Sequence, residues 1–228
     1  MKRYYEAYDL RYRQVHEQGL VWFGEGPTAI VKDMLERRCP KDAPVLEIGC
    51  GEGRDAAGLL EDGWDLLATD VSAEAVAFCR ERFPRWRERF RVLDCLKDGM
   101  AERFGFIYAV AVLHMLVLDE DRQGMLRFIR EHLREKGEAL IVVMGDGRTE
   151  RRTDAEHAFD LQERCHEQSG QRMQLAATSC CMVTWDAFLE ELRRAELEVI
   201  EYGDTAWADA PAAMYALVRS GADGTADV

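Results

Sequence analysis

The sequence predicts an α/β protein in which βα units build a mostly parallel sheet. Short apolar segments alternate with helical patterns, and a glycine-rich turn joins the first of these segments to a helix. No internal repeat or low-complexity linker divides the chain. With 228 residues, 47% of them hydrophobic and 32% charged, the chain is long enough for one sizeable core and short for two. We therefore expect one domain over residues 1–228.

Five apolar segments fit buried strands, and helical patterns separate them. The expected strands are residues 44–50, 64–70, 90–95, 104–113 and 138–145. The expected helices are residues 54–62, 72–83 and 119–135. Ser72 is a suitable N-cap for the second helix, Pro84 should end it near Phe83, and Gly137 should end the third.

The second half of the chain interrupts this alternation. Residues 146–182 are polar and show no clear strand. A helix should follow over residues 184–195 with Thr184 as its N-cap, and then two strands at residues 197–203 and 212–220. The last eight residues, 221–228, should be frayed.

The formal net charge of −13 disfavours a nucleic-acid partner, because an acidic protein repels a phosphate backbone. One basic stretch, residues 80–91, interleaves arginines with Phe83, Trp86 and Phe90. It could bind nucleic acid, but a solvated helix end followed by a strand is the favoured interpretation. The acidic charge favours a small molecule as partner.

No membrane or secretory segment is expected. No apolar run approaches the roughly 18 residues that span a bilayer, and the N-terminus is too polar and aromatic for a signal peptide. The seven cysteines are an odd number without CxxC spacing, which fits reduced thiols rather than a disulfide framework. We therefore expect a cytoplasmic protein.

The glycine-rich turn is the most informative segment. In VLEIGCGEGRD, Gly49, Gly51 and Gly53 follow a buried strand and precede a helix. Such a turn lets a ligand approach the backbone at the carboxyl end of a strand, where open α/β sheets bind ligands. A dinucleotide fingerprint needs glycine where this chain has Arg54, and Glu47 would repel phosphate but suits an ammonium group.

Two further acids end the next strands. Asp70 lies about twenty residues beyond the turn, where a carboxylate can accept the hydroxyls of a ribose. Asp94 begins Asp94-Cys95-Leu96, in which the acid could accept from an adenine amino group while Leu96 covers the ring. These positions indicate a nucleoside ligand.

Taken in order, the glycine turn, Asp70, Asp94, the strand ending VLHML and the segment LREKGEALIVV resemble the class I S-adenosylmethionine-dependent methyltransferases. Within them the chain is similar to the small bacterial methyltransferase-domain proteins, including the tellurite-resistance type. The similarity covers residues 44–145, with a weaker echo over 184–220. It implies a Rossmann-like three-layer sandwich whose seven-stranded, mostly parallel sheet has an antiparallel last strand.

The resemblance also implies roles for individual residues. The cofactor would be S-adenosyl-L-methionine, and the product S-adenosyl-L-homocysteine. Its binding residues would be Glu47, Gly49, Cys50, Gly51, Gly53, Asp70, Val71, Asp94, Cys95, Leu96 and Ala111. Residues 44–145 would bind the cofactor, residues 1–43 would form a helical lid, and residues 146–182 would recognise the acceptor ahead of a C-terminal helix and strands at 183–220. One departure from the family is Gly105, where its members commonly carry aspartate.

Acceptor residues are expected near the ends of these segments. His114 follows the fourth strand and could act as a general base or hydrogen-bond the acceptor, or could serve only as a cap. The N-terminal aromatic run, Tyr4 to Phe23, could close over the cofactor or cover the sheet, so Tyr8, Tyr12 and Trp22 are candidate acceptor contacts, with His166 from the 146–182 segment. Arginines 151, 152, 164 and 172 could receive a carboxylate.

No metal site is predicted, because the histidines and cysteines of residues 146–182 lack ligand spacing. The predicted function is methyl transfer to a small-molecule acceptor, with no nucleic-acid or membrane partner. A methyltransferase-like binding or regulatory protein and an NAD-dependent oxidoreductase are the alternatives. The sequence predicts neither the acceptor atom nor an oligomeric state.

Overall fold

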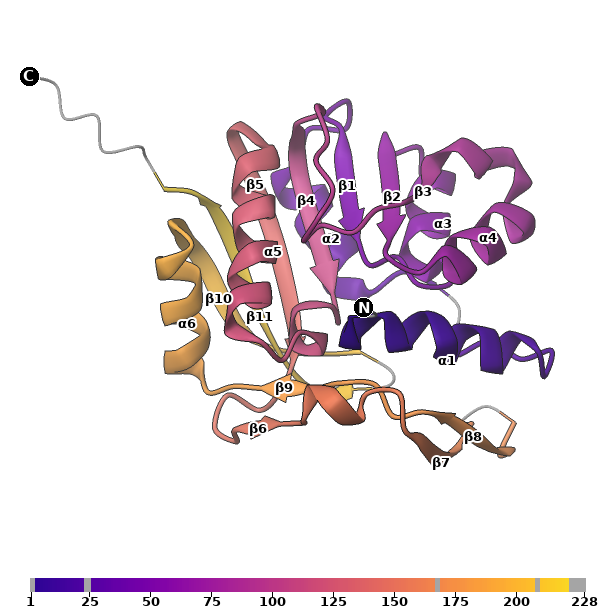
Figure 1. Cartoon of the computed structure of the whole chain (residues 1–228). Helices are drawn as coiled ribbons and strands as arrows, with labels where there is room; N and C mark the ends of the chain where they lie inside the picture. The colour runs from indigo at the N-terminus through magenta and orange to yellow at the C-terminus, as the bar shows by residue number, and fades with distance from the viewer. Residues whose placement is uncertain (1–2, 23–25, 167–168, 208–209, 222–228) are drawn as a thin grey trace, which may run out of the picture.

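In the computed structural model, seven strands form one sheet. They are β1 (Val45–Ile48), β2 (Leu66–Asp70), β3 (Phe90–Val92), β4 (Phe104–Val110), β5 (Leu133–Met144), β10 (Leu197–Trp207) and β11 (Ala210–Ser220). Their order is β10-β11-β5-β4-β1-β2-β3 (Figure 1). β1 to β5 run parallel, whereas β11 is antiparallel to both of its neighbours. The predicted mostly parallel sheet with an antiparallel last strand is confirmed.

The structure describes residues 3–22, 26–166, 169–207 and 210–221. The expectations for Phe23 and for the tail beyond residue 221 lie outside these ranges. Within them, no helix combines the length and the apolar character needed to cross a membrane.

Helices cover both faces of the sheet and make it the middle of three layers. α2 (Ala29–Arg38), α3 (Arg54–Glu61) and α4 (Ala73–Arg82) pack on one face, and α5 (Asp119–His132) and α6 (Trp185–Arg194) on the other (Figure 1). Side chains of β4 alternate between these faces, as strand geometry requires. Ile107 and Ala109 join the core under α5, whereas Phe106 and Tyr108 join the core under α2 and α3.

The predicted helix ends are confirmed where a local signal sets them. The Ser72 hydroxyl accepts a hydrogen bond from the Ala75 amide at 3.0 Å, and the Thr184 hydroxyl accepts one from the Ala187 amide at 3.4 Å. α4 ends before Phe83, and Pro84 opens the short helix η2 (Pro84–Arg89). The basic stretch 80–91 is therefore a helix end followed by the start of β3.

Predicted boundaries of α5, β5, β3 and β4 were wrong because tertiary contacts override the local pattern. α5 ends at His132 and β5 begins at Leu133, which pairs with Phe104. Gly137 therefore lies inside β5, where a Cβ atom would sit 2.9 Å from the Phe104 carbonyl oxygen. β3 ends at Val92, because the chain turns around the Asp94 carboxylate that accepts the Leu96 amide at 3.0 Å. β4 ends at Val110, because Ala111 takes a φ of 61°.

Residues 146–182 contain short strands, contrary to the sequence prediction. β6 (Arg151–Arg152) pairs with β9 (Cys181–Met182), and β7 (Leu161–Cys165) forms a hairpin with β8 (Arg172–Ala176). β6 and β9 are only two residues long and every side chain of β7 is exposed, so only β8 shows the apolar alternation by which strands are found in a sequence. These strands lie below the carboxyl edge of the main sheet, and α1 (Ala7–His16) lies between that edge and the β7–β8 hairpin (Figure 1).

Candidate active site

A cavity of about 990 Å³, here called the inner cavity, opens at the carboxyl ends of β1, β2 and β4. The strand order reverses between β1 and β4, and this reversal leaves a crevice beyond the strand ends. The lining combines the turn after β1, the ends of β2 and β4, and one face of α1.

The turn after β1 depends on glycine at its first position. Gly49 has a φ of +77°, and a Cβ atom there would lie 2.2 Å from Cγ2 of Val112 in the loop after β4. The Gly51 amide donates to Oδ2 of Asp70 at 2.8 Å and so ties the turn to the end of β2. Cys50 lies between them and lines the inner cavity. Hydrogen bonding with Cys79 and burial raise the pKa of the Cys50 thiol well above its ordinary value.

Gly53 serves the packing of the turn. It does not line the inner cavity, and a Cβ atom there would lie 3.0 Å from Cys79 Sγ and from the Phe83 ring. Arg54 does line the cavity, and its guanidinium donates to Thr28 Oγ1 at 2.7 Å and to Asp55 Oδ1 at 3.2 Å.

Glu47 presents a buried carboxylate to the inner cavity. Its side chain is among the lining residues, and its Oε2 atom has no hydrogen-bond partner among the described residues. Burial raises the pKa of Glu47 well above its ordinary value, and the charge of Asp55 adds to this, while Tyr108 and Arg54 partly oppose it. A buried carboxylate oxygen without a donor can receive a cationic or hydrogen-bonding ligand.

Asp70 is held by backbone amides on both of its oxygens. Oδ2 accepts from Gly51 and Oδ1 from Ser72, each at 2.8 Å. Burial raises the pKa of Asp70, and these amide hydrogen bonds oppose the shift. Each carboxylate oxygen retains a second lone pair, so a pair of hydroxyl groups can still bind. Val71 lines the cavity beside it.

The segment after β3 forms another wall of the inner cavity. Asp94 accepts the Leu96 amide through Oδ1, while its Oδ2 accepts the Tyr5 hydroxyl at 3.0 Å and pairs with Lys97 at 2.9 Å. Burial raises the pKa of Cys95 to about 12, so its side chain is a neutral thiol. Cys95 and Leu96 complete this wall.

Three tyrosines of the N-terminal segment reach the inner cavity: Tyr5, Tyr8 and Tyr12. Their spacing of three and four residues places them on one helical face. The Tyr8 hydroxyl donates to the Ser179 carbonyl oxygen at 2.7 Å, which joins α1 to residues 146–182. The aromatic run therefore covers the carboxyl edge of the sheet and also walls the cavity.

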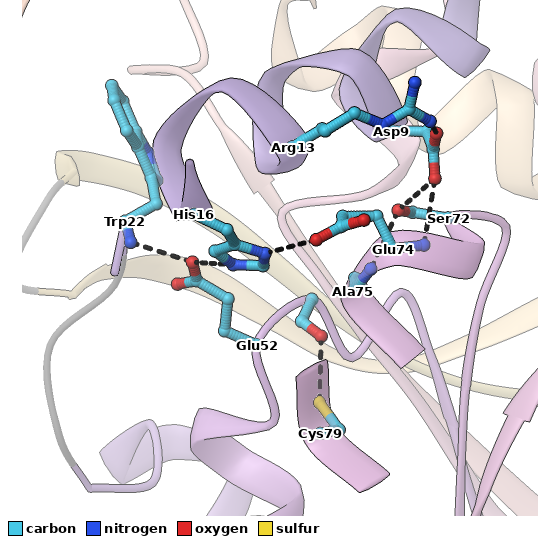
Figure 2. A network of polar contacts seen from close by, with 10 residues as sticks. Asp9, Arg13, His16, Trp22, Glu52, Ser72, Glu74, Ala75 and Cys79 are labelled. Atoms are coloured by element: carbon cyan, nitrogen blue, oxygen red, sulfur yellow. Dashed lines mark hydrogen bonds and ion pairs between the residues drawn. The ribbon is translucent and has the colours of Figure 1, made fainter. Parts of the chain in front are cut away.

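A polar network fixes α1 against the core (Figure 2). His16 lies between two carboxylates, with Nε2 3.0 Å from Glu52 Oε1 and Nδ1 2.8 Å from Glu74 Oε1. Near the start of α1, Asp9 Oδ1 accepts from the Ser72 hydroxyl at 2.8 Å and from the Glu74 amide at 3.0 Å. α1 is thus bound both to the glycine turn and to the N-terminus of α4.

A second cavity, here called the outer cavity, adjoins the first. Four residues line both cavities: Tyr8, Tyr12, Ala111 and Met115. Its other walls come from α1, from the loop after β4 and from residues 146–182, and its empty volume is about 2040 Å³. Two of its lining residues, Ala111 and Thr178, have a positive φ of 61° although neither is a glycine. Such strain concentrates at functional sites.

His114 lies in the outer cavity on the short helix η3 (Leu113–Met115). Its Nδ1 accepts a hydrogen bond from the Met144 amide at 3.3 Å, which leaves the proton on Nε2. Burial, together with the charge of Arg122, lowers the pKa of His114 to about 4. The imidazole is therefore neutral near pH 7 and can donate a hydrogen bond through Nε2. It is poorly suited to act as a general base, because Nδ1 already accepts the Met144 amide and Nε2 already carries a proton.

Trp22 and His166 also line the outer cavity. His166 Nε2 lies 2.7 Å from the Val21 carbonyl oxygen, and its Nδ1 lies 2.8 Å from the Ser169 hydroxyl. The Trp22 amide donates to Glu52 Oε1 at 2.9 Å. Both nitrogens of His166 are engaged within the protein, so only the carbon atoms and the face of its imidazole can contact a ligand. Trp22 lines the cavity beside it.

Gly105, the departure from the related family, lies far from both cavities. It stands at the opposite end of β4, where its amide donates to the Pro44 carbonyl oxygen at 2.9 Å and a Cβ atom would lie 2.8 Å from Ala43 Cβ. Tight packing explains glycine here. Within the described residues, no three His, Cys, Asp or Glu side chains come together as metal ligands would.

The structure adds lining residues that the sequence analysis did not select. Tyr5 and Met115 line the inner cavity, and Arg11 lines the outer one. The helical spacing of Tyr5 with Tyr8 and Tyr12 could have identified the first. No sequence signal marks Met115 or Arg11, since their roles depend on how α1 and the loop after β4 are placed.

Comparison with known proteins identifies the middle of the chain. Residues 46–139 match the family model described as a methyltransferase domain. The probable S-adenosyl-L-methionine-dependent methyltransferase TehB of Haemophilus influenzae is 28% identical over 120 residues, which is 50% of this chain and 41% of that protein. Ribosomal RNA small subunit methyltransferase A of Porphyromonas gingivalis is 38% identical over 64 residues, 28% of this chain and 25% of that protein. The chain thus spans less than half the length of these curated relatives.

Solved structures share the fold over nearly the whole chain. The 1,6-didemethyltoxoflavin-N1-methyltransferase of Burkholderia thailandensis superimposes with a TM-score of 0.69 at 21% identity, covering 97% of this chain and 91% of that one. The CcbJ methyltransferase of Streptomyces caelestis gives 0.70 at 16% identity, with 94% and 99% covered.

Proposed function

Since the chain carries a class I S-adenosylmethionine-dependent methyltransferase domain, we propose that it transfers a methyl group from S-adenosyl-L-methionine to a small-molecule acceptor. One observation carries the proposal: the inner and outer cavities meet at Tyr8, Tyr12, Ala111 and Met115. A nucleoside held in the first cavity would thereby face an acceptor held in the second.

The residues of the inner cavity suit this cofactor. The unpartnered Glu47 carboxylate oxygen is a site for the ammonium group of its methionine portion. Asp70 has acceptor capacity for two ribose hydroxyls, and Asp94 with Leu96 walls the space for adenine. Gly49, Cys50 and Gly51 supply a flat backbone surface for the rest of the cofactor. Gly53 lies outside the inner cavity and supports the turn by packing. When bound, the cofactor supplies an electrophilic methyl group on a sulfonium.

The outer cavity would align the acceptor with that methyl group. In-line displacement is governed chiefly by alignment, which can supply several kcal/mol of the barrier. His114 would donate a hydrogen bond from Nε2 to the acceptor, and Tyr8, Tyr12 and Trp22 would pack against it. α1, held in place by the network around His16, would act as the lid that keeps water out.

Small-molecule specificity is supported by the outer cavity that adjoins the cofactor cavity and by the net charge of −13. The Burkholderia neighbour is titled with bound 1,6-didemethyltoxoflavin and S-adenosylhomocysteine, so the same fold accommodates both kinds of ligand there. The acidic charge also favours a small molecule over the RNA that the name of the Porphyromonas relative mentions.

Calorimetric titration with S-adenosylhomocysteine tests the cofactor assignment. Asp70→Asn should weaken its affinity roughly tenfold to a hundredfold, because charged hydrogen bonds to hydroxyls are lost. Asp62→Asn is the matched control, since Asp62 is an exposed carboxylate that pairs with Lys32. Its affinity should equal that of the wild type.

The proposal has three separate points of failure. No binding of S-adenosylhomocysteine at high micromolar concentration would remove the cofactor from the inner cavity. Equal affinities of wild type and Asp70→Asn would refute the ribose assignment alone. Binding without formation of S-adenosylhomocysteine from S-adenosylmethionine on any acceptor of a broad panel would favour a non-catalytic binding protein.

A further inference from the structure

Three arginines line the outer cavity, Arg11, Arg151 and Arg164, and none of them has a carboxylate partner among the described residues. Arg11 comes from α1 and Arg164 from β7. The hydrogen bonds of Arg11 go to carbonyl oxygens, and Arg164 has only the Gln162 side-chain oxygen, at 3.5 Å. The chain has 43 acidic and 30 basic residues, so carboxylates are not scarce. Within the part of the chain that the structure describes, these arginines of the cavity nevertheless pair with none of them.

Arg11 is held in a fixed orientation. Its Nε and Nη2 atoms donate to the Ala176 carbonyl oxygen at 3.2 and 2.8 Å, and Nη2 also donates to Ala177 at 2.8 Å. Its guanidinium lies 5.6 Å from the Tyr8 ring centre and 5.4 Å from that of Trp22. Nη1 makes no hydrogen bond within the described part of the chain and is not among its buried unpartnered atoms. A preorganised donor is therefore left open to the cavity.

The surroundings of Arg11 favour an incoming anion. Burial lowers the pKa of Arg11, and the positive charge of Arg164 lowers it further, while Tyr8 and Tyr12 oppose this. The two acids of the cavity are engaged elsewhere: Asp160 Oδ2 lies 2.8 Å from His157 Nδ1, and Asp154 accepts the Glu156 amide at 2.9 Å. An anion between the two arginines would offset both the desolvation and the repulsion.

We propose that the methyl acceptor is a small organic acid whose carboxylate binds Arg11 and Arg164. This inference rests on the proposed function, because it names the occupant of the outer cavity. Tyr8 lines both cavities and Arg11 lies three residues further along α1, so roughly 5 Å of helix separates the junction from the anion site. A molecule with a carboxylate at one end and its methylated atom at the other spans that separation, and the Tyr8 and Trp22 rings suit a planar body.

Matched pairs of ligands test the charge preference. The protein is saturated with S-adenosylhomocysteine and titrated calorimetrically with benzoate, 4-hydroxybenzoate, anthranilate and phenylacetate, each beside its primary amide. We expect at least one acid to bind roughly tenfold or more tightly than its amide, as a charge-assisted hydrogen bond provides. Arg11→Met and Arg164→Met should each reduce this ratio toward one, mainly by weakening the acid.

Arg172→Met is the matched control, since Arg172 lies on the neighbouring strand β8, pairs with Glu163 at 3.1 Å and does not line the outer cavity. Its ratio of acid to amide affinity should equal that of the wild type. Arg11→Met also removes the hydrogen bonds from Arg11 to the Ala176 and Ala177 carbonyl oxygens. Arg164 is exposed, so Arg164→Met removes a charge of the cavity without removing these structural bonds.

The affinity for S-adenosylhomocysteine separates the possible failures. Should it bind normally while acids and amides bind equally, or while no acid binds, the inference is overturned and the proposed function stands. Survival of the acid preference in both arginine variants would also overturn it. Failure of S-adenosylhomocysteine to bind the wild type would remove the proposed function, and this inference with it.

Discussion

Among single residues, burial decides which side chains of the site carry charge. Glu47 and His114 both line a cavity, and burial is the first cause of the shifted pKa of each. It favours the neutral form in both, so it raises the pKa of the acid and lowers that of the imidazole. Glu47 is therefore suited to gain a cationic partner, and His114 to donate a hydrogen bond near neutral pH.

Glu47→Gln should separate stability from binding. Because the pKa of Glu47 is raised above 4.5 in the folded protein, its charged form destabilises the fold once the pH exceeds the unfolded value. Glutamine removes that charge, so the free energy of unfolding in urea should increase at pH 8 and change little at pH 4.5. The affinity for S-adenosylhomocysteine should fall roughly tenfold, because a charged contact is lost. A variant that is less stable than wild type at pH 8 would contradict this account of Glu47.

At the scale of elements, three sets of contacts between elements hold the cavities together. α1 is fixed by the network around His16 and by the bond from Tyr8 to Ser179. The short helix η3, which carries His114, is held by Arg122 of α5 through the Leu113 and Leu116 carbonyl oxygens at 2.7 and 3.2 Å. Each contact therefore places a cavity wall.

The docking of α1 should weaken as pH rises. Burial alone would lower the pKa of His16, but hydrogen bonds and charges from Glu52 and Glu74 raise it above 6.5. A raised histidine pKa stabilises the fold fully below the unfolded value and loses that contribution as pH rises through the folded pKa. Hydrogen exchange of the α1 amides, corrected for intrinsic rates, should therefore show more protection at pH 6 than at pH 8.5.

His16→Gln should abolish this pH dependence, because glutamine carries no titrating charge between Glu52 and Glu74. His157→Gln is the control, since His157 is exposed and pairs with Asp160 away from α1. Protection of α1 that is equal at the two pH values in the wild type would show that Asp9 and the tyrosines hold the helix without His16.

Glu191→Gln should destabilise the protein strongly. Arg122 is fully buried and its Nε and Nη2 atoms bind the two oxygens of Glu191 at 2.8 and 2.6 Å, which joins α5 to α6. Removing the carboxylate leaves a buried cation without its counter-charge, so the free energy of unfolding in urea should fall by about 3 kcal/mol. Glu190→Gln, which alters the exposed neighbour paired with Arg193, should leave it unchanged. Equal effects of the two substitutions would contradict the role of this buried pair.

The whole molecule carries a net charge of −13, and part of its one basic stretch is engaged in local contacts. Arg80 donates to the Phe90 carbonyl oxygen, Arg89 pairs with Asp65, and Arg91 pairs with Glu102. A labelled single-stranded RNA should therefore show no binding at physiological salt in a polarisation assay. A tight complex that weakens steeply with added salt would contradict this and would favour a nucleic-acid acceptor.

Much of the fold follows from patterns that extend over only a few residues. Continuous apolar segments predicted the buried strands, Ser72 and Thr184 predicted two helix starts, and the glycine turn with Asp70 predicted the cofactor end of the sheet. Each of these signals acts within one strand, cap or turn. The short strands of residues 146–182 escaped prediction, because β6 and β9 are only two residues long and every side chain of β7 is exposed, which leaves the alternation of β8 isolated.

What the sequence by itself determined is therefore the order of strands and helices and the chemistry at the carboxyl edge of the sheet. The tertiary structure alone decided that α1 walls both cavities, that Gly53 faces α4, that His114 is neutral and that Arg11 and Arg164 share a cavity. The physical reason is sequence distance. A cap or a turn is set by neighbouring residues, whereas burial and charge pairing depend on contacts such as Tyr8 with Ser179, which lie 171 positions apart.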